Sequence, residues 1–416
     1  TASFTRYRFD MKLGTSSEVT QKNPDSYQFT EMSVGYKSGI VDYGIKSDFD
    51  FSPHPNHDVK FGVGYIYHTF RPGVRVVEQK YKQDTIKLSN DTTIGNKNIF
   101  SHETTLFIED NFSVGSVLKI NPGLHYSTFI VQGQFYHSLQ PRISMRALIN
   151  DNFSFKAGYA MMSQYIHLLS NSNISLPTDL WVPVTKRIKP MNSHQYSAGL
   201  KYDWKNIAEF SAEGYYKSMH NLIEYKDGAS FMGSDTGWED KVSMGEGCAY
   251  GVELLAQRSF GKTTGWLGYT WSKSERLFNR PGQELNNGEV FPAKYDRRHD
   301  MSLVVSHTFN ERIDLSGSVL YSTGNAGTLA LQNYSGQIIP DQNYYYSPGY
   351  AVSLPYVSRR NNFRMPDYFR VDFGVNFHKQ LKYGKRTWNL SVYNATNQMN
   401  PFLIYTSYKS AYNPIT

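Results

Sequence analysis

The chain has 416 residues and a modest net charge of +7, with 43 Lys and Arg scattered among 36 Asp and Glu. This scatter argues against nucleic acid as a partner, because a nucleic-acid site gathers its cations on one face. Only 39% of the residues are hydrophobic, although Tyr and Phe are abundant, and no apolar run is long enough for a membrane-spanning helix. A membrane-spanning β-barrel remains allowed, since every second residue of its strands faces a polar lumen.

Alternation of apolar and polar residues with a period of two runs through several long segments. In chain order the clearest are residues 59–67, 153–161, 194–204 and 369–377. In the last of them, one face receives Phe369, Val371, Phe373, Val375 and Phe377, and the other receives Arg370, Asp372, Gly374 and Asn376. A helix cannot separate two such sets, so these segments are predicted to be strands with one apolar and one polar face.

The connections alternate between short polar turns and long segments. Short turns lie at 53–57, 150–152, 205–206, 261–263 and 310–312, where the residues readily reverse a chain. Long irregular connections are expected near 70–97, 165–192, 221–247, 276–297 and 323–365. This asymmetry is typical of outer-membrane barrels, which have tight periplasmic turns and long extracellular loops. The sequence therefore predicts an all-β, up-and-down antiparallel transmembrane barrel with about fifteen strands in this chain, residues 53–57 facing the periplasm and residues 323–365 lying outside.

The alternative fold is a soluble β-propeller or a pair of β-sandwiches, whose strands also alternate. Their sheets would need a shared dry core on one face. Here the less apolar face carries the charged residues Lys156, Lys201, Asp203, Glu209, Glu213, Arg370 and Asp372. This composition favours a polar barrel lumen.

Seven segments have recognisable sequences in a fixed order: residues 140–144 (QPRIS), 160–170 (AMMSQYIHLLS), 176–183 (LPTDLWVP), 221–225 (NLIEY), 268–274 (GYTWSKS), 291–300 (FPAKYDRRHD) and 362–372 (NFRMPDYFRVD). Over nearly the whole chain they resemble the C-terminal barrel portion of TonB-dependent outer-membrane receptors of the Bacteroidetes type. The stretch at 291–300 is the most distinctive of them.

The resemblance implies a barrel of about 22 strands that is plugged by an N-terminal globular domain. On that plan residues 1–416 form a partial receptor barrel, and the plug domain, the TonB-contacting segment and the closing strand are expected to be absent from this chain. The first residues lack the pattern of a signal peptide and are typical of the middle of a strand. Because an open sheet would expose strand edges in lipid, we expect the chain to be a piece of a longer product.

By this resemblance, the protein is an active-transport receptor of the bacterial outer membrane. It binds a scarce nutrient at its extracellular loops and imports it with energy from TonB, by conformational gating and without covalent chemistry. The expected partners are TonB through the plug domain, the lipid bilayer and lipopolysaccharide, a surface lipoprotein, and a small-molecule, glycan or peptide ligand, with no nucleic acid. The alternatives are a passive porin, a barrel-anchored surface adhesin or a soluble β-sheet enzyme. The ligand itself is not determined by the sequence.

No catalytic constellation, cofactor motif or paired metal-ligand spacing is found in the sequence. His54 and His57 share one short turn and could pair on a metal, but Pro53 and Pro55 favour a simple turn. The single cysteine, Cys248, cannot form an internal disulfide and is expected to be a small wall residue.

Aromatic residues in the long connections are the candidates for ligand contact, because extracellular loops meet a substrate first. The candidates are Trp181, Trp238, Tyr344, Tyr345 and Tyr346. They could stack on sugar rings or on a planar ligand, or they could belong to an aromatic girdle at the membrane boundary. For the strand residues Tyr65, Tyr67, Trp204 and Trp271, the girdle is the favoured interpretation.

Four charged residues are candidates at the lumen or at the base of the loops. Arg297 and Arg298, beside Asp296 and Asp300, could bind an anionic ligand, although bracing of neighbouring loops or of the plug is favoured. The other two, Arg370 and Asp372, are predicted to face the lumen.

Overall fold

The computed structural model describes residues 1–22, 25–83, 86–94, 98–170, 180–205, 207–227, 229, 237–330, 332–337 and 351–401. Within these ranges nearly all regular structure is β-strand, and the helical segments are two single 3-10 turns, η1 (Trp238–Lys241) and η2 (Asn286–Gly288). None of the helical segments in these ranges has the length and apolar character needed to cross a membrane. The predicted all-β fold class is therefore confirmed.

One antiparallel sheet of 17 strands contains the whole wall. In spatial order its long strands are β1 (Ala2–Lys22), β2 (Asp25–His54), β3 (His57–Gln83), β5 (Ile99–Val114), β6 (Leu118–Val131), β7 (Gln134–Leu148), β8 (Phe153–Gln164), β11 (Met191–Trp204), β12 (Ala208–Tyr225), β13 (Val242–Arg258), β14 (Thr263–Leu277), β16 (His299–Asn310), β17 (Ile313–Ser322), β22 (Tyr368–Leu381) and β23 (Gly384–Val392). Each pairs with the long strands before and after it, except the edge strands β1 and β23, which have one such partner each; this confirms the up-and-down order. The two remaining strands are short: β4 (Ile86–Ile94) pairs with β3, and β15 (Phe291–Pro292) pairs with β14.

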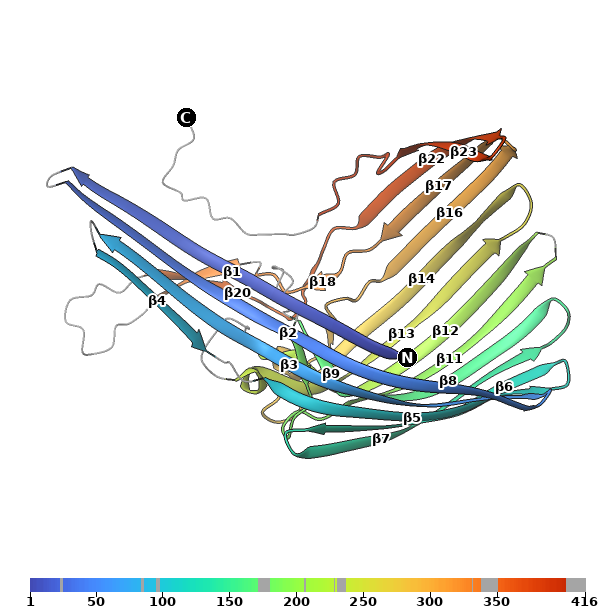
Figure 1. Ribbon diagram of the computed structural model, residues 1–416, viewed down its shortest axis with the longest axis horizontal. Helices are drawn as coiled ribbons and strands as arrows, with labels where there is room; N and C mark the ends of the chain where they lie inside the picture. The colour runs from blue at the N-terminus through green and yellow to red at the C-terminus, as the bar shows by residue number, and fades with distance from the viewer. Residues whose placement is uncertain are drawn as a thin grey trace.

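The wall is curved but open. Figure 1 shows β1 and β23 at opposite edges, and no ladder joins these two strands among the described residues. The long strands β1, β2 and β3, together with the short β4, extend away from the rest of the wall as an arm.

The arm corrects one expectation from the sequence. Residues 70–97 were expected to form a long irregular connection, but β3 continues to Gln83 and pairs with β4 on one side and β2 on the other. Backbone groups are therefore satisfied by ladders on both sides of this part of β3. A strand that projects beyond the apolar layer needs no apolar face, so the sequence lacked the alternation that would have identified it.

The register separates an apolar face from a polar one. Phe49, Phe61, Ile108 and Leu124 are register partners on four adjacent strands, and all four are exposed. On the other face, a cavity is lined by side chains from six strands: Asp58, Asn121, Arg146, Lys156, Ser197 and Glu213. Because one cavity contacts so many neighbouring strands, the polar face is the concave one, as in a barrel embedded in lipid.

The predicted short turns all lie at one end of the wall. They connect β2 to β3, β7 to β8, β11 to β12, β13 to β14, and β16 to β17. The long connections lie at the other end, where Gln132 and Gly133 also make a short turn from β6 to β7 with φ of 48° and 75°. Two successive positive φ values are those of a tight hairpin turn.

The long connections contain short elements of their own. Two small hairpins pair β9 (Ile166–Leu169) with β10 (Leu180–Pro183) and β19 (Gln332–Gln337) with β20 (Ala351–Tyr356), and β18 (Ala326–Gly327) pairs with β21 (Phe363–Arg364). The buried apolar clusters of the described residues gather at this end of the wall. One comprises Leu169, Leu180, Val182, Ile188, Ile223, Tyr225 and Val242; a second Phe70, Ile99, Phe129, Val131, Tyr165 and Val184; a third Met219, Leu222, Phe278, Leu285 and Phe291.

Candidate functional site

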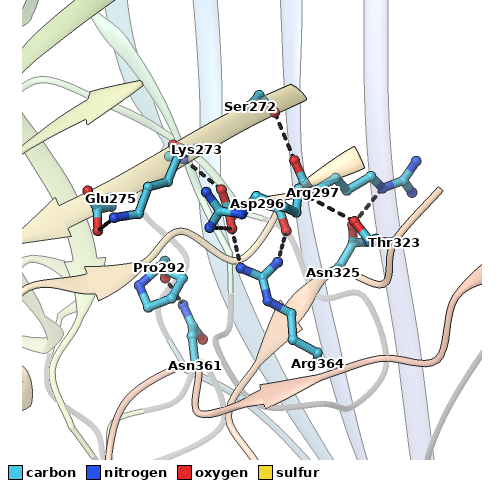
Figure 2. Close-up of polar contacts among 12 residues, drawn as sticks. Ser272, Lys273, Glu275, Pro292, Asp296, Arg297, Thr323, Asn325, Asn361 and Arg364 are labelled. Carbon is cyan, nitrogen blue, oxygen red and sulfur yellow. Dashed lines mark hydrogen bonds and ion pairs between the residues drawn. The ribbon is translucent and has the colours of Figure 1, made fainter. Parts of the chain in front are cut away.

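A buried carboxylate lies at the base of the long connections. Asp296 follows β15, and its side chain is only 1% exposed. The Ser274 backbone N–H donates to its Oδ1 at 2.6 Å, and Arg298 contacts its Oδ2. Arg364 also contacts this Oδ2 (Figure 2). Arg364 also donates to the Asp296 carbonyl oxygen at 2.5 Å. One carboxylate thus connects β14, the segment before β16 and β21.

Arg297 and Arg298 lie in the same network. Figure 2 shows Arg297 beside Asn325. The Arg297 guanidinium donates to Asn325 Oδ1 at 2.7 Å, and its carbonyl oxygen accepts from Ser272 Oγ at 2.8 Å. The Arg298 backbone N–H donates to Thr323 Oγ1 at 2.9 Å. These contacts agree with the bracing interpretation. Binding of an anionic ligand by the two arginines stays a prediction.

A second clamp, centred on Arg360, was not identified from the sequence. Its side chain is 3% exposed and donates to Glu224 Oε2 and Asp227 Oδ1, both at 2.8 Å. Its backbone N–H donates to Asn286 Oδ1 at 2.8 Å. The connection between β17 and β22 is therefore tied to two other connections. No local signal could have revealed this, because the partners lie 133 and 136 residues away in the chain.

Arg370 and Asp372 lie on the polar face of β22, where Asp372 is the register partner of Ser318. They pair with each other at 2.9 Å, and Arg370 also donates to the Tyr393 hydroxyl at 2.7 Å. The Asn394 backbone N–H donates to Asp372 at 2.9 Å. Both side chains thus have protein partners that hold the end of β23 against β22.

Trp181 lies on β10 and lines a pocket at the end of the wall that carries the long connections. The pocket also includes Asp42, Glu103 and Tyr165. The buried His68 bridges the two carboxylates, with its Nδ1 2.8 Å from Asp42 and its Nε2 3.3 Å from Glu103. An indole beside fixed carboxylates and hydroxyls offers both a stacking surface and hydrogen-bonding groups to a polar ligand.

The remaining aromatic candidates have different positions. Trp238 begins η1 and packs against the apolar cluster that contains Leu169 and Tyr225, so part of its surface belongs to a core. Tyr344, Tyr345 and Tyr346 lie outside the described residues. Among the strand aromatics, Tyr65 and Trp204 are exposed on the apolar face, at 38% and 49%, which fits the girdle.

His54 and His57 frame the turn between β2 and β3. The Asn56 backbone N–H donates to His54 Nδ1 at 3.2 Å, and His57 contacts Asp110 at 2.7 Å. Across the described residues, no three His, Cys, Asp or Glu side chains are grouped to hold a metal ion. Cys248 is half-buried on β13, within the wall.

His167 gives the β9–β10 hairpin a pH dependence. Burial lowers the pKa of its imidazole to about 4, although a hydrogen bond with the Lys189 backbone acts in the opposite direction. The folded hairpin therefore holds neutral His167, and its stabilisation is complete above the unfolded pKa of about 6.5. We expect up to about 3 kcal/mol to be lost as the pH falls from about 6.5 towards 4.

Hydrogen exchange of residues 165–184 across this pH range measures the effect. The variant His167→Leu replaces the imidazole with a side chain that does not titrate and should remove the dependence. Equal acid sensitivity in both proteins would assign it to another group.

The chain has the fold of known outer-membrane transporters. The FrpB iron transporter of Neisseria meningitidis (F3-3 variant) matches 94% of this chain and 59% of its own, with 14% identity and a TM-score of 0.55. The outer membrane transporter YddB of Escherichia coli matches 95% of this chain and 63% of its own, with 12% identity and a TM-score of 0.51. The ferric-catecholate import receptor Fiu of E. coli K12 matches 94% of this chain and 61% of its own, with 11% identity and a TM-score of 0.50. The chain thus spans about three-fifths of the length of these transporters.

No curated protein sequence matches the chain significantly. A family model does match: residues 1–395 fit the family described as TonB dependent receptor-like, beta-barrel. This family consists of receptors for transport and is not a family of enzymes. Its barrels lie in the bacterial outer membrane, in agreement with the apolar convex face and polar concave face of the wall. Since the match covers nearly the entire chain, the chain belongs to the β-barrel family of TonB-dependent receptors.

Proposed function

We propose that the protein is an active-transport receptor that captures a scarce nutrient at its extracellular loops and imports it with energy from TonB. The observation that carries the proposal is the family match over residues 1–395 on a wall with a polar concave face. Solved proteins with this fold include an iron transporter and a ferric-catecholate import receptor. Those ligands belong to those proteins, and the nutrient of this receptor is a separate question.

The proposal includes several finer points. The seven recognisable segments favour the Bacteroidetes type, and we include a surface lipoprotein among the partners. Among the described residues no ladder joins β1 to β23, and on the plan of the family further strands would complete the barrel and a plug domain would contact TonB. Lipopolysaccharide surrounds such a barrel in the outer leaflet.

Trp181 is the first candidate for ligand contact, because its indole lines a pocket with carboxylates and hydroxyls. Trp238 is the second, since part of its surface remains exposed beside a core. The tyrosines Tyr344 to Tyr346 complete the proposed contact set. The paired side chains of Arg297, Arg298, Arg370 and Asp372 fit a structural role at the loop base and lumen better than direct contact.

The test uses the full-length gene in cells that depend on one limiting nutrient. Ferric chelates, cobalamin, oligosaccharides and peptides are supplied in turn to cells with and without the gene. For the nutrient that requires the gene, we expect uptake to stop when TonB is deleted or the proton gradient is collapsed. Uptake that survives both treatments would show a passive porin, and surface binding without uptake would show an adhesin.

The ligand site is tested in the same cells. We expect Trp181→Ala to weaken binding of that nutrient about tenfold, the loss of about 1.4 kcal/mol from one stacked side chain. The control is Trp204→Ala, which removes an exposed indole at the opposite end of the wall. Equal binding by the two variants would exclude Trp181 from the site while leaving TonB-dependent uptake untouched.

A further inference from the structure

The same tyrosine–histidine contact recurs around the wall. The Tyr65 hydroxyl lies 2.7 Å from His102 Nδ1, between β3 and β5. Between β8 and β11, the Tyr159 hydroxyl lies 3.0 Å from His194 Nδ1. Between β14 and β16, the Tyr269 hydroxyl lies 2.8 Å from His299 Nδ1.

The geometry of the contact is the same each time. Each tyrosine has a register partner on the neighbouring strand: Thr104 for Tyr65, Tyr196 for Tyr159 and Met301 for Tyr269. The histidine of each pair lies two positions before this register partner in the sequence. Tyr126 and His137, between β6 and β7, repeat the diagonal, with ring centroids 6.2 Å apart. We call these four pairs the Tyr–His row.

The row lies on the convex, lipid-facing side of the wall. Exposed apolar residues lie beside its members on the same face of each strand, such as Leu106 on β5 and Leu139 on β7. From Tyr159 of the row, a line of register partners continues through Tyr196, Tyr216 and Tyr250 on the next three strands. Such a band of tyrosines marks the boundary between hydrocarbon and headgroups. The histidines all lie on the side of their tyrosines that faces the long connections, so they reach the headgroup layer of the outer leaflet.

In the three hydrogen-bonded pairs, the contact with tyrosine sets the tautomer of the histidine ring. A phenol is a better donor than acceptor, so the tyrosine hydroxyl donates to Nδ1 and the ring hydrogen lies on Nε2. In the described part of the chain, no protein acceptor contacts Nε2 of His102, His194 or His299. Each ring therefore presents an N–H donor without a protein partner at headgroup depth.

Neighbouring acids on this face do not oppose an anion. Glu275 pairs with Lys273 at 2.7 Å, and Glu246 pairs with Arg280 at 2.6 Å. On β1, Asp10 pairs with Arg8 at 2.5 Å. Each of these carboxylates is matched by a cation of the same face, so an anionic group meets no unpaired negative charge from them.

We propose that the Tyr–His row binds the phosphate groups of phosphorylated lipids in the outer leaflet, with each Nε2–H donating to a phosphate oxygen. Phosphate oxygens are strong acceptors, and lipid molecules packed along the wall present them at one depth. The row would hold a ring of such lipids around the receptor. A plain aromatic girdle would need no ring nitrogens at these positions.

The test replaces the donors and keeps the rings. The full-length protein carrying His102→Phe, His137→Phe, His194→Phe and His299→Phe retains aromatic side chains that suit the interface. The matched control is His307→Phe, since His307 contacts Thr263 at 2.8 Å on the same face of β16 but near the opposite end of the wall. Wild type and both variants are placed in phosphatidylcholine nanodiscs that contain lipid A with or without its phosphates, and the bound lipid is counted by native mass spectrometry.

We expect the fourfold variant to lose at least about tenfold in affinity for phosphorylated lipid A, with no change for the control or for the dephosphorylated lipid. Equal retention by the fourfold variant and wild type would overturn the proposal. Displacement of the lipid by inorganic phosphate would also overturn it, because the site would then take free phosphate. If the fourfold variant does not fold, the hydroxyl deletions Tyr65→Phe, Tyr159→Phe and Tyr269→Phe decide the question. They free Nδ1 and should weaken phosphorylated-lipid binding, while unchanged binding would contradict the role of the row.

Discussion

Replacing Asp296 by Asn should destabilise the loop base by about 3 kcal/mol, because two arginines would lose the buried carboxylate that they share. The value is at the low end for a broken buried pair, since Arg364 and Arg298 are partly solvated, at 39% and 28% exposed. The amide that replaces the carboxylate would also turn a donor towards a guanidinium or towards the Ser274 N–H. The measurement is denaturant unfolding of the full-length protein in vesicles, together with protease cleavage of the connection between β17 and β22.

Asp300→Asn is the matched control. Asp300 lies four residues further along, is half exposed, and contacts Arg297 only at 3.7 Å. A solvated pair of this kind contributes little, so a change within about 0.5 kcal/mol is expected. A similar loss of unfolding free energy in both variants would mean that the buried position of Asp296 adds no stability beyond that of an exposed ion pair.

The substitution Leu254→Arg is expected to cost about 2 kcal/mol, because a cation on the lipid face of a barrel costs about 2–4 kcal/mol at the bilayer midplane and less towards the interface, where the partner Tyr269 lies. Leu254 is 45% exposed on the apolar face, between its register partners Ala212 and Tyr269. Its side chain meets hydrocarbon, where a guanidinium has no partner. Equilibrium unfolding from vesicles gives the difference directly.

Glu253→Arg provides the comparison at the next residue. Glu253 lies on the polar face, where its register partner on β12 is Glu213. A cation there meets water and an opposite charge, so the free energy of unfolding should hardly change. A larger loss at residue 253 than at residue 254 would mean that the two faces have been assigned the wrong way round.

The wall was predictable because lipid and water impose a period of two on its strands. Residues 369–377 alternate almost without error, and they lie within β22. The short turns were equally visible, since Asn310 and Asn150 supply the side chains that accept backbone N–H groups at those turns. Both signals are local in sequence.

The loop end was much less predictable, because its contacts join distant parts of the chain. Arg360 has no sequence feature that distinguishes it from its neighbour Arg359, yet Arg360 is buried with two acids and Arg359 is exposed. Bracing by Arg297 and Arg298 was an expectation from the surrounding charges, and their hydrogen bonds to Asn325 and Thr323 fit it. The central position of Asp296 was not, since burial of one carboxylate depends on where β21 brings Arg364.

The position of the apolar clusters divides the molecule between two solvents. The wall turns its apolar side chains outwards to lipid, whereas the clusters around Tyr225, Phe129 and Phe291 exclude water beneath the long connections. A detergent micelle replaces the lipid around the wall, but it does not cover the clusters beneath the long connections, which must stay folded in buffer. Solubility and an intact wall therefore carry no information on whether the ligand-facing end is folded, and a preparation intended for binding work has to be judged at its loops.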